Sequence, residues 1–250
     1  MAAITDSTEL PESSYSLLVS HLPHSLALLR RIQFMNIPGG KTDNSHILTL
    51  IDGVFSEAFV LAYLDFSRGP ETEMWLYSSI ERGSLPSEVE AQCEAQIIQV
   101  LKRVGEIEQD YVSERDTPGV VLIGSLHERV LEVTRKWKAV STVRPLTEPY
   151  YKYIFQSEDL PEQKKLGGEG EGEGLKWGRI GKENIPLVLS RTAIPRKERT
   201  LTLLPSASII PRGSPSPIAW GFLGADASLT SLHVEVSSSA QNFILLFTSI

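Results

Sequence analysis

Two stretches near the end of the chain, Pro217-Ile-Ala-Trp-Gly-Phe-Leu-Gly224 and Ser228-Leu-Thr-Ser-Leu-His-Val-Glu235, decide its fold. Each is rich in aromatic, branched or other apolar residues and is bounded by glycine, proline or serine, which is typical of β-strands. The preceding stretch, Ala207-Ser-Ile-Ile-Pro-Arg212, has the same character. The sequence therefore predicts three consecutive strands here.

The first half of the chain predicts a similar mixture of helices and strands. Residues 12–35 have the pattern of two helical pieces broken at Leu22-Pro23, with Arg30 and Arg31 on the outward side. Asp52-Gly53 and Arg68-Gly69-Pro70 are turn signals. They separate three expected strands, at residues 46–51, 58–66 and 73–80.

Two further helices and two further strands are expected before the middle of the chain. Ser87-Glu-Val-Glu90 has the pattern of a capping box, and the helix behind it carries an apolar stripe. Cys93 lies on that stripe, so we interpret it as a small buried hydrophobe rather than a nucleophile. A second capping box is expected at Ser125-Leu-His-Glu128, with strands at residues 120–123 and 150–155.

An acidic, glycine-rich stretch divides the chain. Residues 156–174 end in Gly-Glu-Gly-Glu-Gly-Glu-Gly, whose glycines and repelling carboxylates disfavour order. We therefore expect three parts: a first half at 1–155, a linker at 156–174 and a second half at 175–250. The second half should contain a helix over residues 194–204, with Pro195 in its first turn.

Composition excludes several classes of function. The net charge of -7 disfavours a nucleic-acid-binding protein, which would normally present a basic face. With one cysteine and five histidines that lack ligand spacing, we expect no disulfide and no metal site. We expect His21 and His24 to be surface residues at helix ends. An acidic N-terminus and no apolar run of about 20 residues predict a cytoplasmic or nucleocytoplasmic protein that does not enter a membrane.

The strand motifs carry a resemblance to a known family. Ala219-Trp-Gly-Phe-Leu-Gly224 and Leu229-Thr-Ser-Leu-His-Val-Glu235 resemble the acyltransferase domain of glycine N-acyltransferase-like proteins in the GNAT superfamily. The stretch from Asp65 to Ser79 resembles the same family, as does the order of elements in the first half. The resemblance implies an α+β fold of two tandem GNAT-like halves, each a mixed, mostly antiparallel sheet flanked by helices, with the second half incomplete.

The resemblance also implies a reaction and a set of site residues. The expected reaction transfers an acyl group from acyl-CoA or acetyl-CoA to a small-molecule amine or amino acid. By resemblance, Leu232, His233 and Val234 bind the pantetheine arm of the co-substrate. Trp220, Phe222 and Glu235 contact the acceptor by the same resemblance. We interpret His233 as an alternating strand residue rather than a base, and the catalytic base stays open.

The resemblance stops at Val236. The family continues with a loop of the form Arg/Gln-x-x-Gly-x-Gly/Ala that binds the pyrophosphate, whereas residues 236–250 contain no glycine and no arginine. We therefore expect a truncated acyltransferase half that binds acyl-CoA weakly or not at all and is inactive as encoded. Because Val-Ser is what a common splice-donor hexamer encodes in frame, residues 236–250 are interpreted as a translated intron. The alternative is a non-catalytic scaffold that dimerises through an exposed sheet edge.

The first half lacks the same loop. Where it should lie, Glu81-Arg-Gly-Ser-Leu-Pro86 offers one glycine and a proline. We interpret the first half as a scaffold rather than a second acyl-CoA site.

Overall fold

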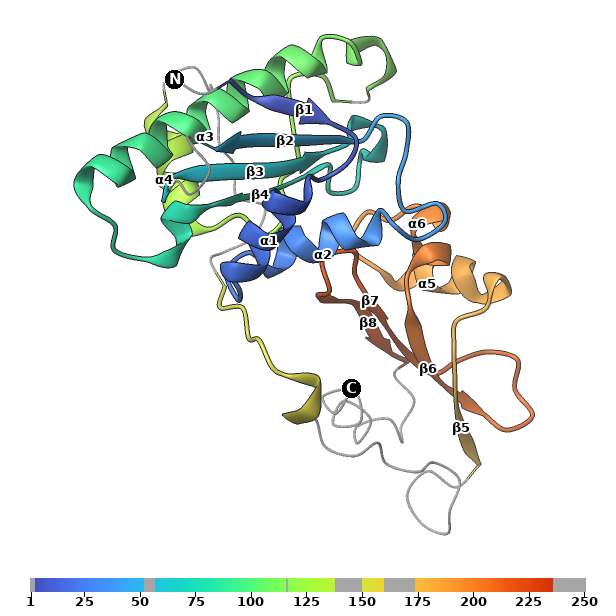
Figure 1. Ribbon diagram of the computed structural model, residues 1–250. Helices are drawn as coiled ribbons and strands as arrows, with labels where there is room; N and C mark the ends of the chain where they lie inside the picture. The colour runs from blue at the N-terminus through green and yellow to red at the C-terminus, as the bar shows by residue number, and fades with distance from the viewer. Residues whose placement is uncertain (1–2, 52–56, 116, 138–149, 160–173, 236–250) are drawn as a thin grey trace. The chain divides into compact units, whose positions relative to one another are not determined.

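The chain folds into two compact units, residues 1–150 and 151–250, each with its own four-stranded sheet (Figure 1). The computed structural model describes residues 3–51, 57–115, 117–137, 150–159 and 174–235. The expected α+β class is confirmed. Most of the expected linker and all of residues 236–250, to which the intron hypothesis refers, lie outside the described residues.

The sheet of the first unit is antiparallel throughout, in the order β1-β2-β3-β4. Its strands are β1 (Thr5–Ser7), β2 (His46–Ile51), β3 (Phe59–Leu64) and β4 (Met74–Ser78). The three strands expected from turn signals and apolar runs are confirmed. Strand β1 was not expected, because three residues are too few to show a periodic pattern.

Helices cover both faces of this sheet (Figure 1). They are α1 (Glu12–Ser20), α2 (Leu26–Phe34), α3 (Ser87–Glu108) and α4 (Glu128–Lys136). Alternate residues of β3 point to opposite faces: Val60 and Leu64 pack with the apolar side of α3, and Phe59 and Leu61 pack with α1 and α2. Every residue of β3 is buried, so this strand lies at the centre of the core.

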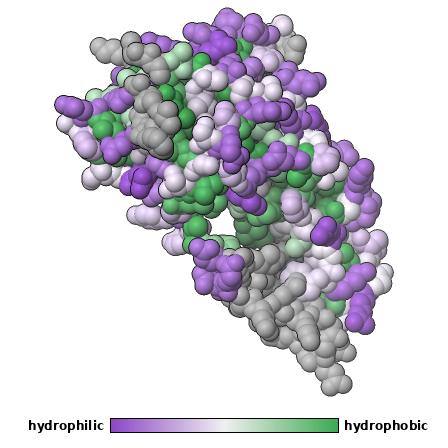
Figure 2. Space-filling view, viewed as in Figure 1, coloured by the Kyte–Doolittle hydropathy of each residue, from purple (hydrophilic) through white to green (hydrophobic). Residues whose placement is uncertain are grey.

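The long helix α3 is amphipathic, as its apolar stripe predicts. Its inner face buries Ile97, Val100 and Val104 together with Cys93, which confirms Cys93 as a core residue. Burial raises the pKa of the Cys93 thiol, which keeps it protonated and unreactive. Figure 2 shows hydrophilic side chains over the outer side of the region that contains α3.

Both predicted capping boxes are wrong in position. Ser87 is already helical and makes no capping bond, because Pro86 occupies the N-cap position of α3. At α4 the cap is the side chain of His127, which accepts a hydrogen bond from the Arg129 N–H, whereas Ser125 lies outside the helix. A real capping box joins Ser78 and Glu81 at the end of β4.

The two later strands expected in the first half do not form. Residues 120–123 make one parallel bridge, between Met74 and Ile123, and Val120 is 58% exposed. Side chains hold this segment instead: Arg115 binds the Glu73 carboxylate at 3.1 Å, and that carboxylate accepts the Leu122 N–H at 3.1 Å. Residues 150–155 are exposed and have no regular secondary structure, because alternation alone supplies no pairing partner.

Arg31 was expected on the outward side of its helix and is buried instead. Its guanidinium lies 3.8 Å from the centre of the Tyr63 ring and donates a hydrogen bond to the Tyr63 hydroxyl. The same hydroxyl donates to Asp65 at 3.1 Å, and Arg68 donates to Asp65 at 3.1 Å. Arg31 and Arg68 both reach the carbonyl of Gly40. A side chain at Gly40 would clash with the backbone, since its Cβ would lie 1.9 Å from the Phe34 carbonyl oxygen.

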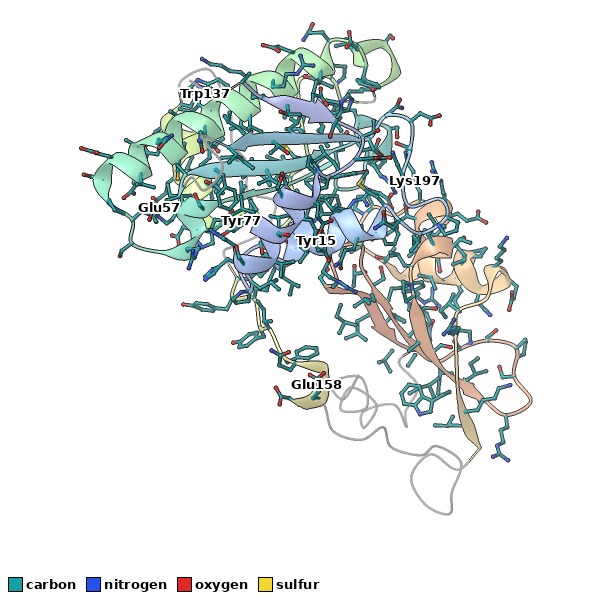
Figure 3. All side chains as sticks on the ribbon, in the orientation of Figure 1. Tyr15, Glu57, Tyr77, Trp137, Glu158 and Lys197 are labelled. Atoms are coloured by element: carbon teal, nitrogen blue, oxygen red, sulfur yellow. The ribbon has the colours of Figure 1, made fainter. Side chains whose placement is uncertain are left out.

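His21 was expected on the surface and is buried instead. Its Nδ1 is 2.9 Å from the hydroxyl of Tyr77, and its ring packs edge-on against Phe59 (Tyr77 is labelled in Figure 3). Burial lowers the pKa of His21 to about 4, and the nearby Arg82 and His24 add to the effect. His24 is exposed, as expected.

The second unit is smaller. Its sheet is antiparallel in the order β5-β6-β7-β8. Its elements are β5 (Leu175–Gly178), α5 (Ile185–Arg191), α6 (Glu198–Leu203), β6 (Ser206–Pro211), β7 (Ala219–Leu223) and β8 (Leu229–Val234). The three expected strands β6–β8 are confirmed. The expected helix over 194–204 is shorter than predicted, and Pro195 precedes it. Short 3-10 turns complete the chain: η1 (Phe66–Arg68), η2 (Ser79–Arg82), η3 (Val112–Glu114), η4 (Ser157–Asp159) and η5 (Lys182–Asn184).

Candidate functional site

Strands β7 and β8 bring most of the predicted site residues onto one face of the second sheet. Trp220 lies directly opposite His233, and Phe222 lies opposite Thr230. A register shift lies between these two pairs, and Ser231 within it has a φ of 50°. The bulge lets Trp220, Phe222, Thr230 and His233 share one side of the sheet although their spacing on the two strands differs.

His233 is the centre of a small cluster. Its imidazole stacks on the indole of Trp220, with ring centres 4.7 Å apart and planes inclined by 30°. Its Nε2 is enclosed, makes no hydrogen bond and lies 3.6 Å from Oε1 of Glu235. The same Glu235 oxygen accepts a hydrogen bond from Nε of Arg191 at 2.9 Å. The cluster is therefore a carboxylate held between a guanidinium and an imidazole.

Arg191 and Arg196 come from the region of α5 and α6, which lies over this face. Arg191 is the last residue of α5. Arg196 lies in the segment between the helices, and its NH2 donates to the Thr230 hydroxyl at 2.8 Å. Sequence reasoning missed Arg191 because it did not predict α5, and it placed Arg196 inside the expected helix over residues 194–204, whereas Arg196 precedes α6. Pro186 in the first turn of α5 was the available signal, because proline is favoured there.

The remaining predicted residues differ in exposure. Leu232 is 45% exposed, and Val234 packs in part against Ile209 and Ala219 on the opposite face of the sheet. Trp220 and Phe222 are each 1% exposed, so their rings support the site from within and do not present an open surface. Their assignment to acceptor binding stays a prediction.

The open edge of β8 offers backbone groups for pairing. Among the described strands of this sheet, β8 pairs only with β7. The N–H of Glu235 donates to the carbonyl of Ile218 in the segment before β7. Because successive N–H groups of a strand alternate in direction, the N–H of Val234 is directed to the open edge. An extended ligand could pair there with main-chain hydrogen bonds.

The corresponding place in the first unit is closed by its own side chains. There, Arg129 of α4 donates to the carbonyls of Ile80 and Gly83 and pairs with Glu90. The first turn of α3 is acidic, with Glu88 and Glu90, so its carboxylates would repel a pyrophosphate. These contacts favour the interpretation of this unit as a scaffold.

Metal and membrane features are limited. Within the described residues, no cluster of histidine, cysteine or carboxylate side chains could hold a metal ion. A search of the same residues finds no helix with the length and apolar character needed to cross a membrane.

The chain is similar in fold to a solved Drosophila protein from a structural genomics programme. The two structures superpose with a TM-score of 0.54, over 98% of this chain and 82% of that chain, at 14% sequence identity. This likeness supports the fold alone. A search of curated proteins found no match.

The sequence also matches a described protein family. Residues 2–153 match the family described as the acyl-CoA N-acyltransferase verG N-terminal domain, which covers more than half of the chain. The matched range includes the stretch from Asp65 to Ser79, which carries the acyl-CoA N-acyltransferase resemblance in the first half, and the family links the chain in general terms to acyl-CoA-dependent transfer. The chain therefore belongs to the family described as the acyl-CoA N-acyltransferase verG N-terminal domain.

Proposed function

We propose that this protein transfers an acyl group from acyl-CoA to the nitrogen of a small amine or amino acid. The family match over residues 2–153 carries the proposal. The second unit supplies the features that such a reaction needs, because transfer between two substrates depends mainly on holding them side by side. These features are an open strand edge for an extended co-substrate and a polar cluster beside it.

The pantetheine arm would pair with the edge of β8 at residues 232–234. The outward N–H of Val234 supports this placement, and the exposed side chain of Leu232 could cover the arm. The acceptor would lie at the end of the strand next to Glu235, whose carboxylate is 30% exposed. Trp220 and Phe222 would support this position from below.

We expect binding of acyl-CoA to be weak. A pyrophosphate is usually held by the N–H groups of a glycine-rich loop at a helix N-terminus. The residues that follow β8 in the sequence, 236–250, contain neither glycine nor arginine. The co-substrate would then depend on the strand edge.

The test is direct. The 250-residue protein is incubated with acetyl-CoA or a longer acyl-CoA and a panel of amines and amino acids, and thiol release and acylated product are measured. Val234→Pro removes the outward N–H and should abolish acyl-CoA binding in calorimetry, whereas Val234→Thr, which keeps the N–H, should not. Transfer or binding that is unchanged in Val234→Pro would contradict this placement, and a wild type without product would contradict the function.

A second candidate is a non-catalytic scaffold that pairs through β8. Leu229 and Leu232 on this edge strand are 55% and 45% exposed, and an exposed apolar edge favours pairing with another chain. Concentration-dependent dimerisation without acyl-CoA binding, measured by light scattering, would favour the scaffold. Leu232→Lys should then give a monomer.

A further inference from the structure

The contacts of His233 resemble those of a histidine that is prepared to accept a proton. An imidazole acts as a base when one ring nitrogen carries a lone pair toward the substrate and the other is held by a carboxylate or carbonyl. In this protein, Nε2 of His233 is enclosed and faces Glu235 at 3.6 Å. The side chain is 26% exposed, and Nδ1 is its other ring nitrogen.

The surroundings fix both the ring and the carboxylate. Stacking on Trp220 limits rotation of the imidazole out of its plane. Arg191 holds Glu235 by a charge-assisted hydrogen bond at 2.9 Å, which keeps the carboxylate beside the ring. The 3.6 Å separation is longer than a hydrogen bond, as is common for catalytic pairs before a substrate binds.

We propose that His233 is the proton acceptor of the acyl transfer, with Glu235, Arg191 and Trp220 as positioning residues. The inference rests on the proposed function and assigns the base that the sequence left open. A proton on Nε2 would point at Glu235 and place the lone pair on Nδ1. The acceptor nitrogen would bind at Nδ1, beside the open edge of β8.

The proton and electron balance of the step is as follows. Nδ1 of His233 takes a proton from the acceptor ammonium, and the freed amine attacks the thioester carbon to form the C–N bond. The C–S bond then breaks, and the thiolate leaves with its electron pair. The thiolate takes the proton held by His233, and the second proton lost from the nitrogen passes to water.

The charges around His233 are consistent with this role. Within the described residues, Glu235, directly after β8, is the carboxylate paired with it, and no carboxylate from β7 faces it. The cations on this side are Arg191, which binds Glu235, and Arg196, which binds Thr230. Glu235 thus stabilises the imidazolium formed during the step, while Arg191 prevents Glu235 from taking the proton itself.

The first experiment observes the ring without activity. Proton–nitrogen NMR of the full chain with labelled histidine should show the proton of neutral His233 on Nε2, and Glu235→Leu should lower the share of this tautomer. Glu183→Leu, at a surface carboxylate of the same unit, is the control and should leave it. A proton on Nδ1, or a tautomer share that is unchanged in Glu235→Leu, would overturn the proposal.

The second experiment measures catalysis. His233→Gln should lower kcat about 10²–10⁴-fold and remove the acidic limb of the pH–rate profile, while acyl-CoA binding in calorimetry is unchanged. Arg191→Ala should lower kcat less and shift that limb, and His24→Gln in the first unit should change nothing.

The failures can be told apart. Transfer by His233→Gln at the wild-type rate with the acidic limb intact contradicts the role of His233 and leaves the proposed function standing. A wild type that neither binds acyl-CoA nor forms product contradicts the proposed function itself.

Discussion

The strands of the first sheet are more completely buried than the strands of the second sheet. In the first unit every residue of β3 and β4 is buried and helices cover both faces. In the second unit none of the strands is buried throughout, and the cluster of hydrophobic side chains around Ile209 and Ala219 has only these two fully buried members among the described residues. The candidate site lies on the less buried sheet. Groups that must meet a ligand are commonly drawn from the less stable parts of a protein.

Removing a buried carboxylate from the first unit should lower the unfolding free energy more than removing a carboxylate from the second unit. Asp65 is fully buried, and although burial raises its pKa, hydrogen bonds from Ser67 and Thr42 and the charge of Arg68 hold it below the usual value. Asp65→Ala leaves the guanidinium groups of Arg31 and Arg68 uncompensated. We expect a loss of about 3–5 kcal/mol in urea unfolding.

The control for Asp65 lies in the second unit. Asp226, in the turn between β7 and β8, accepts hydrogen bonds from the N–H and the hydroxyl of nearby Ser228, and it is partly exposed. Asp226→Ala should cost about 1 kcal/mol or less. Equal losses for the two variants would break the contrast between the units.

Acid should destabilise the first unit through His21. The folded-state pKa of His21 is about 4, below the ordinary value of 6.5, so the unfolded chain binds more protons between these two values. The stability from neutral His21 is therefore complete above about pH 6.5 and is lost as pH falls toward 4, by on the order of 2–3 kcal/mol. His21→Gln should flatten this part of the stability–pH curve. His24→Gln should leave the slope unchanged.

The same truncation in each sheet tests packing directly. Phe59 and Phe222 are each 1% exposed or less. Phe59 lies in the sheet that has helices on both faces, whereas Phe222 lies in the less buried sheet of the second unit. We expect Phe59→Ala to lower the unfolding free energy by about 3–5 kcal/mol. We expect the loss for Phe222→Ala to be about 2 kcal/mol smaller, because less tightly packed surroundings relax more readily into the cavity. Hydrogen exchange of each unit measures the two losses. A larger loss at Phe222 would reverse the comparison.

The smallest effect is expected on the surface of the first unit. Arg103 pairs with Asp6 and Glu106, each at 3.0 Å, and is 39% exposed. Exposed ion pairs add little to stability, so Arg103→Ala should lower the unfolding free energy by less than about 1 kcal/mol. A loss as large as that of Asp65→Ala would show that burial does not explain the difference between the units.

Strands and helices with a clear apolar period were predictable from the sequence. The breaks at Leu22-Pro23 and at Arg68-Gly69-Pro70 follow from local chemistry, and so do the strands β6–β8. The expected turn at Asp52-Gly53 lies outside the described residues. The two predicted capping boxes were wrong because Ser-x-x-Glu is a common pattern that also occurs where serine is not the N-cap residue. Pro86 takes the N-cap position and Ser87 is the first helical residue of α3, whereas the real box begins at Ser78, at the end of a strand.

Residues whose partners are distant in sequence were not predictable. Arg31 has the sequence context of an outward helical residue, but it is buried because Tyr63 and Asp65 reach it from β3 and the residue that follows. In the candidate site, the strand residues could be named from the resemblance. Their contact with Arg191 could not, because it links residues 44 positions apart.

Because β8 contains a bulge, the number of residues between Thr230 and His233 decides on which face of the sheet His233 lies. Trp220 pairs with His233 on one side of the bulge, and Phe222 pairs with Thr230 on the other, so the strand changes register by one residue around Ser231. If Ser231 were deleted, the residues on one side of it would turn over, and the imidazole would leave the indole on which it stacks. Relatives with and without the extra residue at the bulge should therefore form two groups. In these two groups the histidine should lie on opposite faces of the same sheet, a difference that no single substitution would produce.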